Sequence, residues 1–416
     1  MDNSRQKKGT RPQDVRARNS QLLLQELSLT SGQTISELSK KLHLSRTAVQ
    51  NIVLLLQQEG IITDGGKRDS TRLGGKRAVF YQLHSRYKHS IFVYLNSRFV
   101  IAEVYDFTLM RLSYRIGDVS QLSYPEMLQS IVKLIEKVLD NAGLMQKNIY
   151  GIAIAVSGTV DSENGRLVSL TGDNIPEKWG KDLPLVHDLR EQMGIDADIY
   201  LDNMCNFSGL NSFDSLRQGP LKSCLYLLAH SRGVGATYIR DGCIEKGVHN
   251  LLGEIGHTVI DWKSEFPCRC GRKGCFEATL YPDAIRQQVN EAIWDIAFPD
   301  LAPGTVRSMD DLLRKANEGN PCALQVTNHL AEQFAQLLYN IQIMEDPACI
   351  IFHDSYSISC EAFHRAILSA CREKTKGVLK VPIQLLFDTE PFTERVRKGA
   401  VSCLRSRFFD SFSHAL

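Results

Sequence analysis

The feature that most constrains this chain is a short run of cysteines and glycines in its second half. Three cysteines fall within the eight residues from 268 to 275, two glycines lie between them, and a histidine stands a short way upstream. Thiolate sulfur and imidazole nitrogen are the donors that tetrahedral zinc prefers. Glycine adopts positive φ at little steric cost, so the loop can fold back and bring the sulfurs together. The sequence therefore predicts a zinc knuckle with four ligands, His257, Cys268, Cys270 and Cys275.

Two other structures are compatible with these cysteines, namely a disulfide or three unrelated thiols in a loop. A bridge between Cys268 and Cys270 would close a very small, strained ring, and no segment of the sequence indicates an oxidising compartment. Zinc is therefore the preferred interpretation. Because four protein ligands leave no open coordination position, the metal is expected to be structural.

Acidic residues flank the knuckle. Glu254 lies just before it and Glu277 just after it. Closing the loop on a metal would bring these carboxylates and the imidazole of His257 together, and such hydrogen-bonding groups suit a polyhydroxylated ligand. On spacing alone, ordinary surface acids explain the two glutamates slightly better.

The order of these residues resembles a family signature. The segment GEIGH followed by CxCGxxGCxE is similar to the signature of the ROK family (repressors, open reading frames and sugar kinases). Members of that family use these residues to bind zinc and sugar. The resemblance also implies sugar contacts from an asparagine in Asp-Asn-Ile-Pro and from the first asparagine of a kinase motif. The implied sugar-binding residues are Asn174, Asn203, Glu254, His257 and Glu277.

At three positions, the residue-by-residue assignment of family roles to this sequence is less straightforward. Without the resemblance, an asparagine such as Asn174 before Ile-Pro is usually a turn residue. The spacing from His257 to Cys268 is one residue longer than usual, which bears on the geometry of the histidine ligand. Tyr281 stands where many members have serine.

Composition narrows the class of protein. The 416 residues are 43% apolar and 23% charged, which is typical of a globular chain with more than one domain. No apolar stretch follows the basic residues at the start, and no run of about 18 apolar residues occurs, so neither a secretory signal nor a membrane span is expected. Eleven cysteines, scattered apart from the knuckle, favour a reducing, cytoplasmic location.

The near-zero net charge conceals an asymmetry along the chain. Through Ser90 the sequence has 16 basic and 7 acidic residues, whereas the remainder has 33 basic and 40 acidic residues. A basic N-terminal block suits a polyanionic partner such as DNA, because each neutralised phosphate releases condensed counterions. A charge imbalance by itself is more often only a solvated surface.

Capping signals in the basic block predict a helix-turn-helix. A loosely amphipathic helix covers Val15–Leu27, and Thr34 with Glu37 forms a capping box that opens a short helix to about Leu42. Ser45 caps the next helix, which ends near Gly60. Two helices joined by so short a turn are the helix-turn-helix arrangement, although any small three-helix domain has capped helices.

The expected DNA contacts lie on the second helix and on a wing. The start of that helix carries side chains able to pair with base edges, and a polar loop from Asp64 to Lys76, before the strand Ala78–Leu83, carries basic residues for phosphate contact. The loop ends in Gly-Gly-Lys-Arg and resembles the wing of ROK repressors. The predicted DNA-binding residues are Arg46, Thr47, Gln50, Asn51, Lys67, Arg68 and Arg72.

Beyond residue 88 the pattern changes to alternating strands and helices, which is typical of an α/β body. The resemblance implies a two-lobed, actin-like sugar-kinase fold with ligand between the lobes. The expected domains are a tail at 1–14, a winged helix-turn-helix at 15–88 and the body at 89–416. The main expected elements of the body are a hairpin within 90–104, helices at 124–142 and 324–344, and strands at 149–156, 225–228 and 348–352.

Kinase motifs are degraded in the body. Where family kinases carry Asp-x-Gly-Gly-Thr in the first hairpin, this chain has Leu95–Phe99 without carboxylate or glycine. Met204 replaces the aspartate that takes the proton from the sugar, and a thioether is no general base. Asp202, roughly 6–7 Å away along a strand, is a poor substitute. His353-Asp354 replaces a late Gly-Gly, whereas Gly233-Val234-Gly235 is kept.

Together these features predict a cytoplasmic transcriptional regulator, more specifically a repressor, which binds a double-stranded DNA operator and senses a sugar or sugar derivative. A homodimer or higher homo-oligomer without membrane association is expected. Two alternatives remain: an active sugar kinase with a DNA-binding head, and a regulator that responds to a protein partner instead of a sugar.

Overall fold

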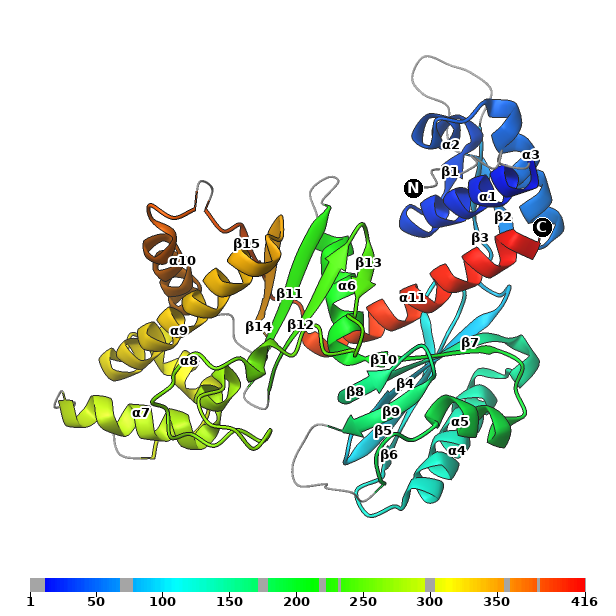
Figure 1. Ribbon diagram of the computed structural model, residues 1–416. Coiled ribbons are helices and arrows are strands. Elements are labelled where there is room, and N and C mark those ends of the chain that lie inside the picture. The colour runs from blue at the N-terminus through cyan, green and yellow to red at the C-terminus, as the bar shows by residue number, and fades with distance from the viewer. Residues whose placement is uncertain are drawn as a thin grey trace, which may run out of the picture. The chain divides into compact units, whose positions relative to one another are not determined.

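The computed structural model of the chain describes residues 12–67, 78–170, 179–216, 222–230, 233–295, 304–354, 360–379 and 382–415. The chain divides into two compact units, which comprise Met1–Asp202 with Ala400–Leu416 and Asn203–Gly399. Each unit contains a five-stranded sheet flanked by helices, and the first unit also carries an N-terminal head (Figure 1).

Within residues 12–67 and 78–88, the head consists of three helices and a three-stranded sheet. The sheet order is β1-β3-β2, and both strand pairs are antiparallel. The helices bury apolar side chains that include Leu24, Val49 and Leu56, whereas Leu22 of the first helix is exposed. The elements are α1 (Pro12–Leu29), β1 (Gln33–Thr34), α2 (Ile35–Leu42), α3 (Arg46–Gln58), β2 (Ile62–Lys67) and β3 (Val79–Leu83).

Side-chain caps fix the helix-turn-helix. Thr34 Oγ1 accepts a hydrogen bond from the Glu37 backbone N–H (3.3 Å), and Glu37 Oε2 accepts one from the Thr34 backbone N–H (2.8 Å). Ser45 Oγ accepts a hydrogen bond from the Ala48 N–H (3.1 Å). His43 ends α2 in the left-handed region, with φ of 52°. The predicted capping box, second cap and turn are confirmed. These features depend only on residues close in sequence, which is why the sequence alone could predict them.

Two boundaries in the head differ from the expectation. α1 begins at Pro12 instead of Val15, because proline suits the first helical turn, where its missing N–H is not needed. Residues 12–14 of the predicted tail are therefore helical. Gly65 and Gly66 lie in β2 at a bulge instead of in a loop. A Cβ at Gly65 would lie 2.0 Å from the Phe80 ring, so glycine allows that ring to cover the strand.

The sheet of the first unit has the order β10-β7-β4-β5-β6. β4 pairs in parallel with β7 and antiparallel with β5. Every residue of β7 is buried, as expected for a central strand covered on both faces. The elements are β4 (His89–Leu95), β5 (Phe99–Tyr105), β6 (Arg111–Asp118), α4 (Tyr124–Ala142), η1 (Gln146–Asn148), β7 (Ile149–Val156), β8 (Gly158–Asp161), β9 (Arg166–Leu170), α5 (Leu185–Met193) and β10 (Asp198–Asn203).

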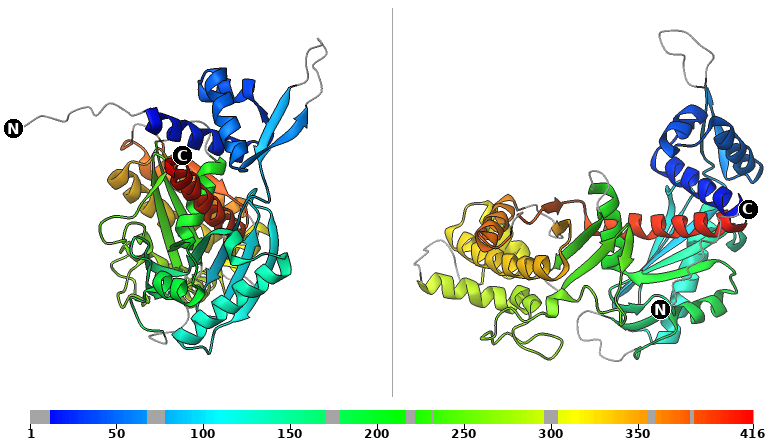
Figure 2. Two further views of the ribbon diagram at one scale, coloured as in Figure 1. Left: turned by 90° about the vertical axis from the view of Figure 1, so that its right-hand side faces the viewer. Right: turned by 45° about the horizontal axis from the view of Figure 1, so that its top comes forward.

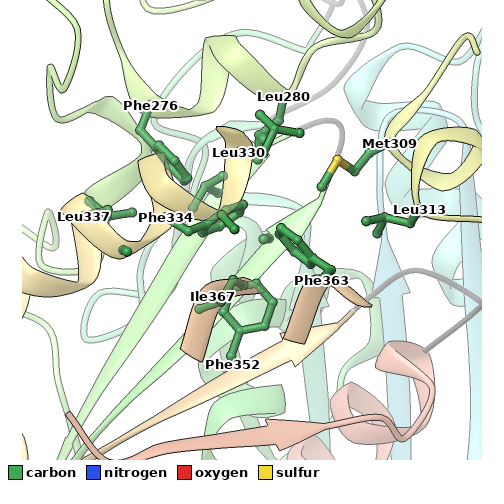
Figure 3. Packing of buried hydrophobic residues seen from close by; sticks show 14 of the residues in the cluster. Phe276, Leu280, Met309, Leu313, Leu330, Phe334, Leu337, Phe352, Phe363 and Ile367 are labelled. Atoms are coloured by element: carbon green, nitrogen blue, oxygen red, sulfur yellow. The ribbon is translucent and has the colours of Figure 1, made fainter. Parts of the chain in front are cut away.

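The second unit is built on the sheet β13-β12-β11-β14-β15. Helices α8, α9 and α10 pack together beside the sheet around a core of phenylalanines, of which Phe334 contacts Phe276, Phe352 and Phe363 (Figure 3). The elements are α6 (Met204–Leu216), β11 (Ser223–His230), β12 (Gly233–Arg240), β13 (Cys243–Glu245), η2 (Ile255–His257), η3 (Phe276–Leu280), α7 (Pro282–Asp295), α8 (Met309–Asn317), α9 (Pro321–Glu345), β14 (Cys349–Asp354), α10 (Glu361–Thr375) and β15 (Leu385–Asp388).

The last helix, α11 (Phe392–Ala415), contributes residues to both units. It is one continuous helix (Figure 2). Its residues up to Gly399 belong to the second unit, and those from Ala400 belong to the first. The chain therefore passes between the units twice, after Asp202 and within α11. The sequence pattern did not predict this helix.

The other predicted body elements are confirmed. The helix at 124–142 and the strand at 149–156 have the expected bounds, and the remaining elements differ by a few residues at their ends. Among the helices in the described ranges, none has the length and apolarity required to cross a membrane.

Candidate metal centre and ligand site

The knuckle is a tight double turn held by backbone hydrogen bonds. The N–H of Cys268 donates to the carbonyl of Arg272 (2.7 Å), and the N–H of Gly271 donates to the carbonyl of Cys268 (2.9 Å). Gly271 and Gly274 have φ values of 85° and 78°, which confirms that the loop uses left-handed glycines. A Cβ at Gly274 would lie 2.4 Å from the carbonyl oxygen of Asp261, so this glycine also permits a close backbone approach.

The four predicted metal ligands converge. One donor atom from each of the ligands His257, Cys268, Cys270 and Cys275 lies within 4.8 Å of all the others. His257 Nδ1 is 3.5 Å from Cys268 Sγ, and the sulfurs of Cys270 and Cys275 are 3.6 Å apart. Ideal tetrahedral zinc bonds imply separations of about 3.6 Å for nitrogen to sulfur and about 3.8 Å for sulfur to sulfur. The arrangement therefore fits a closed zinc site, and the extra residue between His257 and Cys268 does not prevent it.

Glu277 is held at both carboxylate oxygens. Its side chain is 8% exposed, Oε2 accepts a hydrogen bond from the Val234 backbone N–H (3.2 Å), and Oε1 accepts one from the Tyr281 hydroxyl (2.6 Å). The preceding residue, Phe276, inserts into the core against Phe334 with ring centroids 4.6 Å apart (Figure 3). This anchor fixes the backbone from which Glu277 projects.

His257 lies near the carboxylates of both Glu254 and Glu277. His257 Nδ1 lies 3.7 Å from Glu277 Oε1, and His257 Nε2 lies 3.9 Å from Glu254 Oε2. Partial burial raises the pKa of Glu254, an effect that His257 opposes and Glu277 reinforces. Between them, Gly256 passes so close to β12 that a Cβ would lie 2.5 Å from the Val234 carbonyl. The motif GEIGH thus needs its second glycine for packing.

The two predicted asparagine contacts have different outcomes. Asn203 ends β10, and its Oδ1 accepts a hydrogen bond from the Cys205 backbone N–H (2.6 Å) at the start of α6. Asn174 lies outside the described residues. Three of the five predicted sugar-binding residues, Glu254, His257 and Glu277, are therefore brought together by the second unit alone.

Tyr281 is a component of this cluster that the sequence identified only as a departure from the family pattern. Its hydroxyl donates to Glu277 Oε1 and lies 3.8 Å from Cys268 Sγ. The guanidinium carbon of Arg269 lies 5.1 Å from the centre of its ring. Burial and the adjacent Glu277 carboxylate raise the pKa of Tyr281, so the phenol remains a donor at neutral pH. Its position four residues after Glu277 was the available signal.

The predicted base-contacting residues share one exposed surface of the head. Arg46, Thr47, Gln50 and Asn51 are all exposed on the first turns of α3, opposite the buried face of that helix. Arg46 Nη2 donates to Ser36 Oγ (3.2 Å), which ties its side chain to α2. The predicted wing residues are only partly described: Lys67 is exposed at the end of β2, whereas Arg68 and Arg72 lie outside the described residues.

Comparison with known proteins agrees with both parts of this description. Residues 16–63 match the model "Winged helix-turn-helix DNA-binding", and residues 105–384 match that of the ROK family. The chain belongs to the ROK family. The resemblance noted from the knuckle motif is thereby confirmed.

Individual relatives of this ROK protein include regulators and kinases. The xylose repressor of Caldicellulosiruptor bescii is 26% identical over 343 residues, which cover 79% of this chain and 80% of that protein. A glucokinase of Halalkalibacterium halodurans is 25% identical over 226 residues, 53% of this chain and 66% of that protein. A crystal structure described as a ROK family transcriptional regulator, a homologue of the E. coli MLC protein, superposes with a TM-score of 0.76 at 19% identity, covering 97% of this chain and all of that one.

The first hairpin of this ROK protein closes its own turn. Asn96 Oδ1 accepts hydrogen bonds from the backbone N–H groups of Arg98 (2.8 Å) and Phe99 (2.9 Å). A phosphate-binding nest depends on backbone N–H groups that are available to the anion. In this chain the side chain of Asn96 already occupies two of them.

Asp202, the nearby acid that could have substituted for the lost catalytic aspartate, and His353, at a degraded kinase position, are both packed into the protein. Asp202 is fully buried and accepts a hydrogen bond from the Tyr200 hydroxyl (2.8 Å). His353, at the late Gly-Gly position, is also fully buried, with Nδ1 2.6 Å from the Tyr226 hydroxyl and Nε2 2.9 Å from the Glu390 carbonyl. An imidazole thus lies where the family kinases have glycine.

Proposed function

We propose that this ROK protein is a sugar-responsive, DNA-binding transcriptional repressor whose kinase-like body binds its ligand without phosphorylating it. The single observation that carries the proposal is the contrast within the body. The two glutamates expected to bind sugar each lie within 4 Å of the knuckle residue His257 (3.7 and 3.9 Å). By contrast, Asn96 closes the turn that binds nucleotide in family kinases, and Met204 replaces the catalytic aspartate. The helix-turn-helix head and the xylose repressor among the relatives support the regulatory role.

The ligand site would bind a sugar or sugar derivative through polar side chains. Glu254 and Glu277 would accept hydrogen bonds from ligand hydroxyls, and Asn203, also of the second unit, would add a contact. A structural zinc ion on His257 and the three knuckle cysteines would stabilise the loop that positions both glutamates. The distances between donor atoms support zinc, and its closed coordination gives it no catalytic role.

Helix α11 is the proposed route from the body to the head. In the second unit, Arg395 of α11 makes a two-pronged ion pair with the buried Asp388 (2.9 and 3.0 Å). In the first unit, Arg405 Nη1 donates to the carbonyl of Phe107 (3.2 Å), and the Phe408 ring lies 6.2 Å from Tyr87 on the segment that follows the head. One helix therefore contacts both the ligand-binding unit and the segment leading to the DNA-binding head.

The proposed mechanism is a population shift in a homodimer or higher homo-oligomer. A ligand that binds one arrangement of the two units more tightly than another changes the spacing of two heads, and hence their fit to operator half-sites about 34 Å apart. The protein would act in the cytoplasm, where its DNA partner lies. None of the eleven cysteines, all of which lie in the described ranges, forms a disulfide, and this suits a reducing compartment.

Operator binding tests the assignment of the head. Binding sites selected from a random double-stranded DNA pool by the intact protein provide the probe. Replacing Gln50 and Asn51 by alanine should weaken binding to the selected site by about 10-fold or more, because each good base contact contributes about 1–3 kcal/mol of discrimination. Gln287→Ala, on exposed α7 of the second unit, should bind normally. Undiminished binding by the double variant would refute the proposed recognition surface.

A sugar kinase with a DNA-binding head is the second candidate, and the glucokinase relative favours it. Incubation with ATP, magnesium and a panel of hexoses discriminates the two functions. The proposal predicts no ADP release above a protein-free control, whereas turnover at ordinary kinase rates of about 1–100 per second would establish the enzyme.

A further inference from the structure

Tyr281 occupies a helix position where its residue type is unusual. Its carbonyl accepts the hydrogen bond of the Ile285 N–H (2.9 Å), which places Tyr281 at the N-cap of α7. Serine, threonine, asparagine and aspartate are favoured at an N-cap, because their short side chains accept a hydrogen bond from the first helical turn, and losing such a cap costs about 1 kcal/mol. A tyrosine hydroxyl extends too far from the backbone for that role. The side chain reaches Glu277 instead.

The Tyr281 hydroxyl completes the fixation of Glu277. The backbone N–H of Val234 holds Oε2 at 3.2 Å, and Tyr281 holds Oε1 at 2.6 Å. A carboxylate restrained at only one oxygen can rotate about its last bond, whereas restraint at both oxygens fixes its plane. The lone pairs that remain on Glu277 therefore point in set directions.

The same hydroxyl lies beside a metal ligand. Cys268 Sγ is 3.5 Å from Glu277 Oε1 and 3.8 Å from the Tyr281 hydroxyl oxygen. Zinc is bound by thiolate, so loading the knuckle would place the Cys268 sulfur, with part of its negative charge, next to a buried carboxylate. Like charges at that separation repel, and repulsion is stronger away from bulk water. The phenol O–H is the donor positioned between these two groups.

We propose that Tyr281 is a positioning residue that holds the Glu277 carboxylate in place next to the zinc-bound Cys268 and thereby sets ligand affinity. It acts through Glu277. The inference deepens the proposed sugar-binding function and rests on it for the ligand, whereas the effect on zinc is independent of that function.

Tyr281→Phe tests the hydroxyl alone, because it keeps the ring that lies beneath Arg269. The intact protein is loaded with zinc, and the rate of zinc transfer to a chromogenic chelator is measured with and without the substitution. Affinities for xylose, N-acetylglucosamine and glucose are measured by calorimetry. Tyr238→Phe is the matched control, since Tyr238 is a buried tyrosine of the same unit that lies four residues beyond Val234 on β12, about 13 Å along the strand.

We expect Tyr281→Phe to release zinc several-fold faster and to bind the recognised sugar on the order of tenfold more weakly, since hydrogen bonds to charged groups are among the stronger ones. Tyr238→Phe should change neither value. Tyr281→Ser restores a preferred helix-capping residue. Its melting temperature should therefore stay close to that of the wild type, whereas its sugar affinity should be lower than that of the wild type. A purely structural role for Tyr281 would not separate stability from affinity in this way.

The outcomes distinguish the inference from the function on which it rests. Wild-type zinc transfer and wild-type sugar affinity in Tyr281→Phe would overturn the role of Tyr281. If the wild-type protein binds none of the three sugars, the proposed function is weakened, and the zinc-transfer rate alone then decides on Tyr281: an unchanged rate rejects the inference, and a faster rate supports it.

Discussion

At the scale of single residues, the two knuckle glycines make different demands. Both have positive φ, but a Cβ at Gly271 would meet nothing within 4 Å, whereas one at Gly274 would lie 2.4 Å from the Asp261 carbonyl. Gly271→Ala therefore carries only the cost of a left-handed alanine, about 1–2 kcal/mol. Gly274→Ala adds a backbone clash, and we predict a larger fall in melting temperature together with loss of bound zinc. Metal analysis and thermal unfolding of both variants test this, and equal effects would contradict it.

The ligand residues show what the sequence could predict about the site. Donor chemistry and glycine conformation are local properties, so the cluster of four candidate metal ligands and the left-handed glycines could be predicted from the spacing of residues 257–275. The contact between Tyr281 and Glu277 depends instead on how η3 turns into α7 and on the length of a side chain. The spacing of four residues from Glu277 is the one local signal, and by itself it does not show that the Tyr281 hydroxyl reaches that carboxylate.

At the scale of elements, α11 depends on a buried ion pair. Asp388 is 1% exposed, and Arg395 is 5% exposed. Burial alone would raise the pKa of Asp388. Hydrogen bonds from Arg395 and Ser212 to the carboxylate outweigh burial, so the pKa of Asp388 lies below its usual range. A carboxyl group whose pKa is lower in the folded than in the unfolded state stabilises the fold at neutral pH. This contribution declines once the pH falls below the unfolded-state pKa of about 4, and it is lost as the pH passes through the folded-state pKa.

Removing the cation should therefore destabilise the protein strongly. Arg395→Met leaves a buried carboxylate without its partner, which typically costs about 3–5 kcal/mol. Arg365→Met removes an exposed ion pair with Glu361 and should cost less than about 1 kcal/mol. The difference in unfolding free energy between the two variants should become smaller below pH 4. Chemical denaturation at pH 7 and pH 3.5 measures it, and equal stabilities at pH 7 would show that the ion pair does not support α11.

These arginines also explain why α11 was missed. Arg395 and Arg405 are almost completely buried, at positions where an amphipathic pattern would require apolar residues. Their charges are satisfied by Asp388 and by the Phe107 carbonyl, which lie far away in sequence. By contrast, helix 124–142 has an unbroken apolar stripe, and the pattern predicted both of its ends.

At the scale of the whole molecule, the charge asymmetry of the sequence follows the division between head and body. The described residues of the head and its connecting segment (12–67 and 78–88) include eight basic and five acidic side chains, whereas the sequence beyond Ser90 has 33 basic and 40 acidic residues. The ROK model and the winged helix-turn-helix model match these two parts separately. The sequence pattern identified an α/β body, and only the family resemblance supplied its two lobes, because lobe formation depends on pairings between distant strands such as β11 with β14.

The most direct test of the central claim is to measure operator affinity by fluorescence anisotropy with and without the sugar that most stabilises the intact protein against heat. A ligand at 100 times its dissociation constant stabilises the native state by about 2.7 kcal/mol, so such a sugar is readily found. The account predicts that saturating sugar weakens operator binding at least several-fold in the wild type. It predicts no response in Glu277→Gln, whose sugar-free operator affinity should be normal. Operator affinity that stays constant while sugar demonstrably binds would contradict the account.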